Sequence, residues 1–372
     1  MTGLLDIRNL DISLTLPGGK LHAVKDVTLS LDRGEALGIV GESGSGKSMT
    51  ALALMRLLPR SATCSATALR FDGQELPELD DATFSSRIAG PRIGMIFQEP
   101  MTSLNPVYTV GRQMTEAAVA RGLLSAKAAR QKAVDLLDRV GIPDPAARMD
   151  QFPHQMSGGQ RQRVMIAMTL MLDPDLLIAD EPTTALDVTT QDEILRLINK
   201  LVIDEGLTHL MITHNLGVVR ATADDVYVMN KGEIVESGPL RRIFEAPKTA
   251  YARDLVDAIP PLYGDGVKDQ QVSDGAPLVE LKAVTKTFSR KRLLRPDEAT
   301  QAVRGVDLNI ARGEIFGLAG ESGSGKTTLA RMVMGIMQPS EGRVFIDGRP
   351  LSDTGGRADR RLAQIVYQNP GT

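Results

Sequence analysis

A glycine-rich stretch that occurs twice carries the clearest chemistry in this sequence of 372 residues. GESGSGKS occupies residues 41–48, and GESGSGKT occupies residues 320–327. In this spacing successive backbone N–H groups wrap phosphate groups, the lysine adds a cation, and the last hydroxyl binds Mg²⁺. The residues predicted to bind nucleotide are Gly41, Glu42, Ser43, Gly44, Ser45, Gly46, Lys47 and Ser48, and Gly320, Glu321, Ser322, Gly323, Ser324, Gly325, Lys326 and Thr327. Two sites for a Mg²⁺-bound nucleotide are therefore expected, with Ser48 and Thr327 as metal ligands.

Two neighbouring acids indicate how a bound nucleotide is hydrolysed. Asp180 and Glu181 follow the apolar run LLIA, where a buried strand is expected to end. We assign Asp180 to Mg²⁺ binding and Glu181 to orienting and deprotonating the attacking water. A solvated turn or a helix cap is the alternative for adjacent acids, and the block PTTALD that follows argues against it.

Short apolar runs predict the strands that position these residues. EALGIV at 35–40 and EIFGLA at 314–319 lead into the two glycine-rich stretches. LLIADE at 176–181 contains the acid pair, and HLMITH at 209–214 ends at His214. Uninterrupted apolar runs are typical of strands inside a parallel sheet, so we expect all four to be buried parallel strands.

The remaining patterns predict an antiparallel sheet and a helical segment around that core. Alternating apolar residues at 4–14 and 278–288 indicate antiparallel strands, and VYVMNKGEIVESG at 226–238 indicates a hairpin with its turn at Asn230–Gly232. Residues near 107–145 have apolar side chains at helical spacing. We expect them to form a helical insertion between two halves of an α/β core.

The chain contains an internal repeat that suggests two units. Residues 22–48 align with residues 301–327, at an offset of 320 − 41 = 279 residues. The segment 259–277 is rich in Pro, Gly, Asp and Gln and has no periodicity, which predicts a linker. The sequence therefore predicts a complete domain over residues 1–258 and a second unit over residues 278–372.

Composition narrows the function classes. A formal net charge of −3 argues against a general nucleic-acid binder, which usually has a basic excess. The single cysteine, Cys64, excludes a disulfide framework or a cysteine metal cluster and is expected to be a bystander. The first residues do not read as a secretory signal, and no run of about eighteen apolar residues predicts a membrane span. Any association with a membrane is therefore expected to occur through a partner.

The segment MSGGQ at 156–160 resembles the signature motif of ATP-binding-cassette (ABC) ATPases, and the resemblance covers residues 3–240 and resumes at about 278. It implies an α/β P-loop NTPase fold: a parallel core sheet with an antiparallel β subdomain and a helical insertion, followed by a partial second cassette. FQEPMTSLNP, PHQMSGGQRQRVMIAM and VYQNP resemble more narrowly the peptide/nickel importer branch. The double arrangement is similar to members of that branch in which two ATPases are fused on one polypeptide.

The resemblance also implies roles for residues outside the glycine-rich stretches. Gln98 corresponds to the Q-loop, with catalytic and Mg²⁺-binding roles, residues 185–187 correspond to the D-loop, and His214 corresponds to the switch histidine. Taken alone, His214 is better interpreted as a buried polar residue at a strand end, but its place directly after an apolar strand favours the catalytic role. Phe288 is the aromatic residue expected to stack on adenine, whereas the aligned position of the first unit is Leu14. The further nucleotide-binding residues implied are Ser157, Gly158, Gly159, Gln160, Asp187, Phe288 and Gln368.

The family mechanism uses two cassettes that face each other head to tail, with each ATP between one P-loop and the other cassette's signature. The implied cofactors are ATP and Mg²⁺. The implied partners are membrane permease subunits and, through them, a periplasmic or surface substrate-binding protein, with no nucleic acid. This places the chain peripherally on the cytoplasmic face of a bacterial inner membrane. Peptide, nickel and glutathione-like cargo remain open.

The second unit contains a P-loop and Gln368 but no second signature, acid pair or switch histidine. The site at Lys47 lacks a signature motif from a second cassette to face it. The site at Lys326 can be faced by the signature at Ser157, but the second unit has no acid pair of its own. We expect residues 278–372 to be weakly stable alone, because strands that should flank the P-loop strand do not follow it. A homodimer through residues 1–260 would supply two complete sites. A fragment of a longer fused protein is a further interpretation that the sequence leaves open.

Two other functions remain as alternatives. The first is a non-transport protein with tandem cassettes, such as a translation factor. The second is a nucleotide-binding regulator that no longer hydrolyses ATP. The residues MTSLNP after Gln98 and the helical segment behind them favour a transporter, because they resemble a docking surface for a membrane partner.

Overall fold

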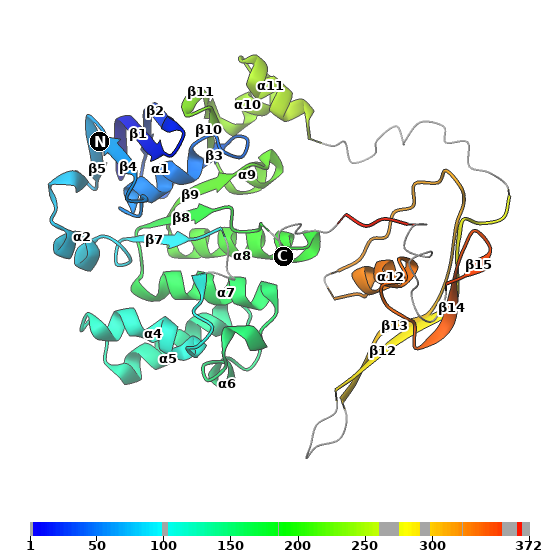
Figure 1. The fold of residues 1–372 in the computed structure, drawn as a ribbon. Helices are drawn as coiled ribbons and strands as arrows, with labels where there is room; N and C mark the ends of the chain where they lie inside the picture. Colours follow the sequence, from blue (N-terminus) through cyan, green and yellow to red (C-terminus); the bar gives the residue numbers. More distant parts are fainter. Residues whose placement is uncertain are drawn as a thin grey trace. The chain divides into compact units, whose positions relative to one another are not determined.

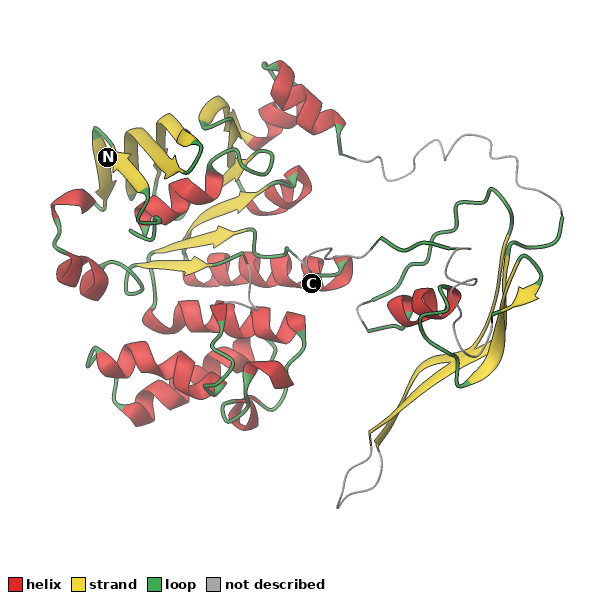
Figure 2. Ribbon diagram, viewed as in Figure 1, coloured by secondary structure: helices red, strands yellow, loops and turns green. Residues whose placement is uncertain are grey.

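The computed structural model describes residues 3–98, 103–184, 186–259, 275–290, 298–321, 323–351 and 363–366. Figures 1 and 2 show the ribbon, coloured along the chain and by secondary structure. The contacts divide the chain into two compact units, Met1–Pro261 and Leu262–Thr372, and each is described by itself. Most of the predicted linker, residues 260–274, lies outside the described residues.

A six-stranded sheet forms the centre of the first unit, with the strand order β11-β10-β3-β9-β8-β7. Its strands are β3 (Ala36–Val40), β7 (Ile93–Ile96), β8 (Leu176–Asp180), β9 (Thr208–Thr213), β10 (Asp225–Asn230) and β11 (Glu233–Pro239). All neighbours are parallel except the β10–β11 hairpin. The predicted parallel strands at 35–40, 176–181 and 209–214 and the predicted hairpin at 226–238 are confirmed.

An antiparallel sheet is the second layer of this unit, with the order β2-β1-β5-β6 and with β4 paired to β1. Its strands are β1 (Leu5–Leu16), β2 (Gly19–Leu31), β4 (Ala62–Ser65), β5 (Ala68–Phe71) and β6 (Gln74–Glu75). Alternate apolar residues of β1, such as Leu5 and Ile7, are fully buried, as expected for a strand with one face on the core. The predicted strand at 4–14 is confirmed.

Helices cover the parallel sheet and form a separate layer beyond it (Figure 2). They are α1 (Lys47–Leu54), α2 (Asp81–Arg87), α4 (Val110–Ala120), α5 (Ala126–Arg139), α6 (Pro145–Arg148), α7 (Gly158–Thr169), α8 (Val188–Glu205), α9 (Leu216–Thr222), α10 (Leu240–Glu245) and α11 (Ala250–Asp257), with short 3₁₀ turns η1 (Leu76–Glu78), η2 (Pro153–Gln155) and η3 (Leu170–Leu172). Side-chain caps start the insertion helices: Thr109 accepts from Arg112 N at α4, and Ser125 accepts from Ala128 N at α5. The predicted helical insertion near 107–145 is confirmed.

The parallel sheet separates two hydrophobic cores. Along β8, Leu176 and Ile178 belong to the core shared with the antiparallel sheet, whereas Leu177 and Ala179 belong to the core shared with the helices. This alternation follows from the two-residue period of a strand. Both faces of β8 are buried, which explains why its sequence is apolar without interruption.

The second unit has a four-stranded antiparallel sheet with the order β13-β12-β14-β15. Its elements are β12 (Val279–Arg290), β13 (Glu298–Ile310), α12 (Lys326–Val333), β14 (Glu341–Ile346) and β15 (Arg349–Pro350). A small core lies between α12 and this sheet, made by Leu281, Val284, Val303, Leu329, Met332 and Val344. The predicted antiparallel strand at 278–288 is confirmed.

One predicted strand is wrong. Residues 314–319, EIFGLA, are not a strand, and the side chains of Ile315, Phe316 and Leu318 are 69%, 41% and 47% exposed. The aligned strand β3 is held by β9 and β10, which lie far later in the chain. No strand pairs with residues 314–319 in the part of the second unit that the structure describes. A strand without neighbours has unpaired backbone groups, so the apolar sequence alone does not form one.

Candidate nucleotide site

The predicted catalytic residues meet at one edge of the parallel sheet. In the strand register, Val40 of β3 lies opposite Thr213 of β9, and Asp180 of β8 lies opposite Ile212. Because these strands are parallel, their carboxyl ends lie side by side, and the loops that follow them converge. The glycine-rich loop, the acid pair, His214 and Gln98 all follow or end such strands.

Two glycines let the loop at residues 41–46 pass close to neighbouring backbone. A Cβ on Gly41 would lie 2.0 Å from the carbonyl oxygen of Met229. Gly46 has φ +104°, and a Cβ there would lie 2.5 Å from the carbonyl oxygen of Ala23. Only glycine fits at both positions, so the loop curls tightly and α1 begins directly behind it. The positive end of that helix and the loop's N–H groups suit a phosphate.

Lys47 is the buried cation of the loop. Only 4% of it is exposed, and its Nζ donates to Gly41 O at 2.8 Å, Glu42 O at 2.7 Å and Ser45 Oγ at 3.2 Å. Burial lowers the pKa of Lys47, and the nearby carboxylates of Glu181, Asp180 and Glu42 oppose this shift. A poorly solvated cation of this kind attracts phosphate more strongly than a lysine in water does.

Ser48 and Asp180 form the predicted metal site. Ser48 Oγ donates to Asp180 Oδ1 at 2.9 Å, which brings together two residues 132 positions apart. Burial raises the pKa of Asp180 to about 6, the repulsion from Glu181 adds to this, and the bond from Ser48 and the charge of Lys47 oppose it. A carboxylate that is costly to bury without a counterion is well suited to a cation.

Glu181 is the centre of a hydrogen-bond cluster. Its carboxylate accepts from Gln98 Nε2 at 3.0 Å, Thr184 Oγ1 at 2.9 Å and His214 Nδ1 at 3.0 Å. Because a carboxylate only accepts, His214 carries its proton on Nδ1. Burial would raise the pKa of Glu181, but the bonds from His214 and Thr184, together with the electrostatic effects of His214 and Lys47, outweigh it and lower the pKa. Glu181 is therefore held ionised.

The backbone of Glu181 is in an unusual conformation, with φ 46°. A non-glycine residue in this region is uncommon, and such strain often lies at functional sites. Its N–H donates to Ile212 O at 2.8 Å, which continues the β8–β9 ladder. This bond and the side-chain contacts together hold the carboxylate at the sheet edge.

The residues fit a Mg²⁺-bound nucleoside triphosphate. Mg²⁺ prefers oxygen ligands and usually takes only one or two from the protein, with the rest from phosphates and water. Ser48 Oγ and Asp180 supply such oxygens, and Gln98 has its amide oxygen in addition to the nitrogen used on Glu181. No group of three or more His, Cys, Asp or Glu side chains among the described residues could hold a metal by itself.

The predicted signature residues lie apart from this cluster. Ser157 begins α7 as part of a capping box: its Oγ accepts from Gln160 N at 3.2 Å, and Gln160 Oε1 accepts from Ser157 N at 3.0 Å. Ser157 and Gly158 are exposed, and a Cβ on Gly159 would lie 2.8 Å from Thr190 Cγ2. Asp187 caps α8 by accepting from Thr190 N at 3.0 Å. No hydrogen bond among the described residues joins residues 157–160 to the loop at 41–48.

The second glycine-rich loop has the same local bonds without the surrounding cluster. Lys326 Nζ donates to Gly320 O at 2.7 Å, Glu321 O at 2.6 Å and Ser324 Oγ at 3.3 Å. Thr327 is exposed, and within the described residues no carboxylate contacts it. Phe288 is 44% exposed, and Lys286 Nζ lies 5.7 Å from its ring centre. Ser322 and Gln368 lie outside the described residues.

The structure brings in two residues that the sequence analysis did not select. Thr184 bonds to Glu181 and stands within the block PTTALD, so the motif itself could have indicated it. Tyr251 accepts a hydrogen bond from Glu42 N at 3.0 Å, and the two residues are 209 positions apart. No local pattern in the sequence predicts this second contact.

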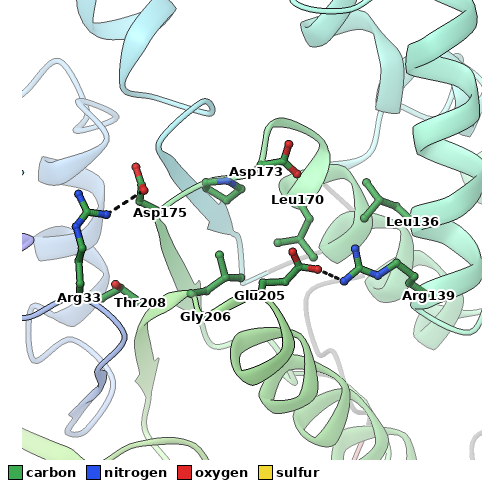
Figure 3. A pocket seen from close by; sticks show the side chains of 11 residues that line it. Arg33, Leu136, Arg139, Leu170, Asp173, Asp175, Glu205, Gly206 and Thr208 are labelled. Carbon is green, nitrogen blue, oxygen red and sulfur yellow. Dashed lines mark hydrogen bonds and ion pairs between the residues drawn. The ribbon is translucent and has the colours of Figure 1, made fainter.

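A partly open pocket lies at the opposite edge of the parallel sheet, near the start of β8 and β9 (Figure 3). It has a volume of about 230 Å³. Ion pairs lie along it, between Arg33 and Asp175 at 3.1 Å and between Arg139 and Glu205. Because its charged groups are already paired, it lacks the open phosphate-binding chemistry of the carboxyl edge.

Comparison with known sequences agrees with this geometry. The model of one protein family, described as ABC transporter, matches residues 24–184 and 303–372. The chain is 40% identical over 399 aligned positions to the glutathione import ATP-binding protein GsiA of Escherichia coli K12, and 39% identical to GsiA of Salmonella typhimurium LT2. In both cases the alignment covers 99% of this chain and 64% of the relative, so the chain spans less than two thirds of these relatives.

Solved structures give the same picture of the fold. The ATP-binding cassette MJ0796, in a dimeric post-hydrolysis state bound to ADP and Pi, matches with a TM-score of 0.56 and 29% identity, covering 64% of this chain and 99% of that one. CbiO1 of Clostridium perfringens, part of the transporter complex cbiONQ, matches with a TM-score of 0.55 and 29% identity, covering 66% of this chain and 91% of that one. Among the described helices, none has the length and apolar character needed to cross a bilayer.

Proposed function

This chain belongs to the ABC transporter family, and on that premise we propose that it binds ATP with Mg²⁺ at Lys47 and hydrolyses it. The observation that carries the proposal is the cluster around Glu181, in which four side chains from three loops meet next to a buried lysine. A chance glycine-rich turn has no reason to be surrounded by such groups. Membership of the family accounts for the fold, and the cluster around Glu181 is the evidence for hydrolysis.

Each residue of the cluster has a role in this proposal. The loop at 41–46 and the start of α1 hold the phosphates, with Lys47 on the terminal groups. Mg²⁺, held by Ser48 and Asp180, would neutralise charge on the phosphates. Glu181 is ionised and orients the attacking water while accepting its proton. Gln98, Thr184 and His214 keep that carboxylate in place, and the exposed ring of His214 can reach the terminal phosphate.

We further propose the assembly in which hydrolysis occurs. Residues 1–258 act as one cassette, residues 259–277 as a linker, and residues 278–372 as the opening part of a second cassette. At the start of α7, Ser157 and Gly158 are exposed and Gly159 and Gln160 are half-buried. These four residues would face a nucleotide held by another P-loop, with Asp187 beside that interface. The facing P-loop would belong to a second cassette, on the same polypeptide or on a second copy of the chain. The identity to GsiA, a single polypeptide longer than this chain, favours the tandem arrangement.

The transport role is proposed from the relatives. GsiA proteins are named for glutathione import, which favours glutathione or a short peptide over nickel as cargo. The partners would be membrane permease subunits and a substrate-binding protein, with this chain bound peripherally on the cytoplasmic side. The test is uptake of labelled glutathione and of a labelled dipeptide by cells that carry or lack this gene. Unchanged uptake of both would contradict the importer assignment.

The hydrolysis proposal is tested by Glu181→Gln in the purified chain. We expect the ATPase rate to fall by about 10² to 10⁴, the usual contribution of a general base, while the affinity for Mg²⁺–ATP is retained. Glu245→Gln, a change at an exposed glutamate of α10 paired with Arg241, is the matched control. A rate that does not depend on Glu181 would contradict the catalytic role, and binding without any turnover would favour a regulator.

A further inference from the structure

The glycine-rich loop is held by a side chain from the far end of the first unit. The hydroxyl of Tyr251, in α11, accepts a hydrogen bond from Glu42 N at 3.0 Å. The carbonyl of Gly41 belongs to the same peptide group, and it accepts from Lys47 Nζ at 2.8 Å. A peptide group is planar and rigid. The tyrosine bonds to its N–H and the lysine to its C=O, so together they fix its orientation.

The position of Tyr251 is itself well determined. Its ring packs against the core that contains Val40, the last residue of β3 before the loop. Just ahead of it, the carboxylate of Glu236 accepts from Lys248 N at 3.0 Å and from Thr249 N at 2.9 Å. Glu236 is 7% exposed, and these bonds keep its pKa low although burial alone would raise it. A buried, fully bonded carboxylate thus anchors the start of α11 to β11.

The two supports contact opposite ends of the peptide group. Lys47 Nζ has three N–H donors, which go to Gly41 O, Glu42 O and Ser45 Oγ, so a contact with phosphate takes at least one of them. The hydroxyl of Tyr251 contacts the N–H end of the same peptide group. Its hydrogen bond holds the peptide group between Gly41 and Glu42 whichever partner the lysine gives up.

We propose that Tyr251 is a positioning residue of the nucleotide site, which holds the glycine-rich loop in its phosphate-binding form when Lys47 contacts the phosphate. This inference rests on the proposed ATP site. It assigns to the end of β11 and to α11 a role in nucleotide affinity, through Glu236, Thr249 and Tyr251. A purely structural tyrosine would act through its ring, whereas this role requires its hydroxyl.

Tyr251→Phe separates the two roles, because it keeps the ring and removes the oxygen. The matched control is Tyr227→Phe in β10: Tyr227 is also half-buried, and its hydroxyl interacts with the backbone of Ser30, away from the loop. The first measurement is hydrogen exchange of the Glu42 amide without nucleotide. We expect exchange to be about 2- to 10-fold faster in Tyr251→Phe, the usual worth of one hydrogen bond, and unchanged in Tyr227→Phe.

The second measurement determines KM and kcat separately for the hydrolysis of Mg²⁺–ATP. The dissociation constant of Mg²⁺–ADP is measured by direct titration. We expect KM and the Mg²⁺–ADP dissociation constant to rise about 2- to 10-fold in Tyr251→Phe, with kcat within about twofold and with little change in Tm. Unchanged Glu42 exchange together with unchanged affinity would overturn the inference. A fall in kcat at constant KM would overturn it as well, because the residue would then act on the chemistry.

Failure of the proposed hydrolysis would be visible separately. In that case the rate would be absent or insensitive to Glu181→Gln, whereas amide exchange at Glu42 would still report whether Tyr251 holds the loop. If Tyr227→Phe changes Glu42 exchange as much as Tyr251→Phe does, the effect is general loosening and the inference fails.

Discussion

The two glycine-rich loops have the same seven residues, GESGSGK, and nearly the same local structure in different surroundings. Each lysine bonds to the same two carbonyls and to the same serine of its own loop. Around Lys47 lie Asp180, Glu181 and Tyr251, and the lysine is buried. Lys326 is partly exposed, and in the described part of the second unit no acid takes those places. A P-loop conformation is thus a local property, whereas a hydrolytic site is a property of the sheet behind it.

The strand before each loop shows the same contrast. EALGIV forms β3 between β9 and β10, and EIFGLA, with a similar apolar pattern, forms no strand. The difference lies in the neighbours, because a parallel strand is stabilised by chain segments that are distant in sequence.

The largest expected difference is in the hydrogen-exchange rates of the two aligned segments that precede the glycine-rich loops. Amides of residues 36–40 should exchange about 10³-fold or more slowly than those of residues 314–319, because core strands open only with the whole unit. Mass spectrometry of peptides from the two segments measures the ratio. Equal protection would show that the second segment is paired in solution and would also contradict the weak stability expected for residues 278–372.

Acid should destabilise the first unit through His209. This side chain of β9 is fully buried, its ring nitrogens have no hydrogen-bond partner among the described residues, and burial lowers its pKa to about 4, against a weaker backbone interaction with Thr222. Below pH ~6.5 the unfolded chain binds a proton that the folded unit excludes, so stability falls as the pH drops from about 6.5 to about 4, by about 3 kcal/mol in total. Urea unfolding at several pH values measures this loss.

The control for the acid effect is His209→Leu, which cannot titrate and fits an apolar strand. We expect its stability to change less between pH 7.5 and pH 5 than that of the wild type. All four histidines, His22, His154, His209 and His214, belong to the first unit, so the second unit should lack this response. An equal pH dependence in the variant would show that His209 is not the group responsible.

The two P-loop lysines should differ in their effect on nucleotide binding. Lys47→Ala removes charged hydrogen bonds from a buried site and should weaken the tighter Mg²⁺–ATP site by about 10- to 100-fold. Lys326→Ala should act on a weaker, more exposed site. Calorimetric titration of each variant distinguishes the sites by affinity and stoichiometry. The contrast fails if Lys326→Ala weakens the tighter site as much as Lys47→Ala does.

Alanine in place of the first glycine of each loop should give the smallest difference in stability between the two units. Gly41→Ala places a Cβ 2.0 Å from a backbone oxygen of Met229 and should destabilise the first unit by about 2 kcal/mol. Gly320→Ala meets the rotatable Ser324 Oγ at 2.9 Å and adds backbone strain at φ +154°, but it meets no backbone atom, so a smaller loss is expected. Gly46→Ala and Gly325→Ala serve as the reference pair, because both glycines have φ near +100° and both would clash with a backbone carbonyl. Thermal unfolding with exchange measured in each unit gives the comparison, and similar losses for Gly41→Ala and Gly320→Ala would contradict it.

Much of the first unit was predictable from particular residues. β3, β8 and β9 follow from their uninterrupted apolar runs, and Ser48, Asp180 and Glu181 follow from the chemistry that a Mg²⁺-bound nucleotide requires. The hydrogen bond from Gln98 to Glu181 was not predictable in detail, because it depends on the register of β7 against β8. Tyr251 was not predictable at all, since its contact with Glu42 depends on how α11 packs against the end of β3.

By itself, the sequence determined the conformation of both glycine-rich loops and the identity of the groups that could bind phosphate and Mg²⁺. The hydrogen bonds of such a loop span at most six residues, and its glycines permit the tight turn. The same residues therefore form the same lysine–carbonyl bonds in both units. Only the tertiary structure decided which loop has a buried lysine, an acid pair and a supporting tyrosine. Those groups are brought together by strand pairing over more than a hundred residues, as the bond between Ser48 and Asp180 across 132 positions shows.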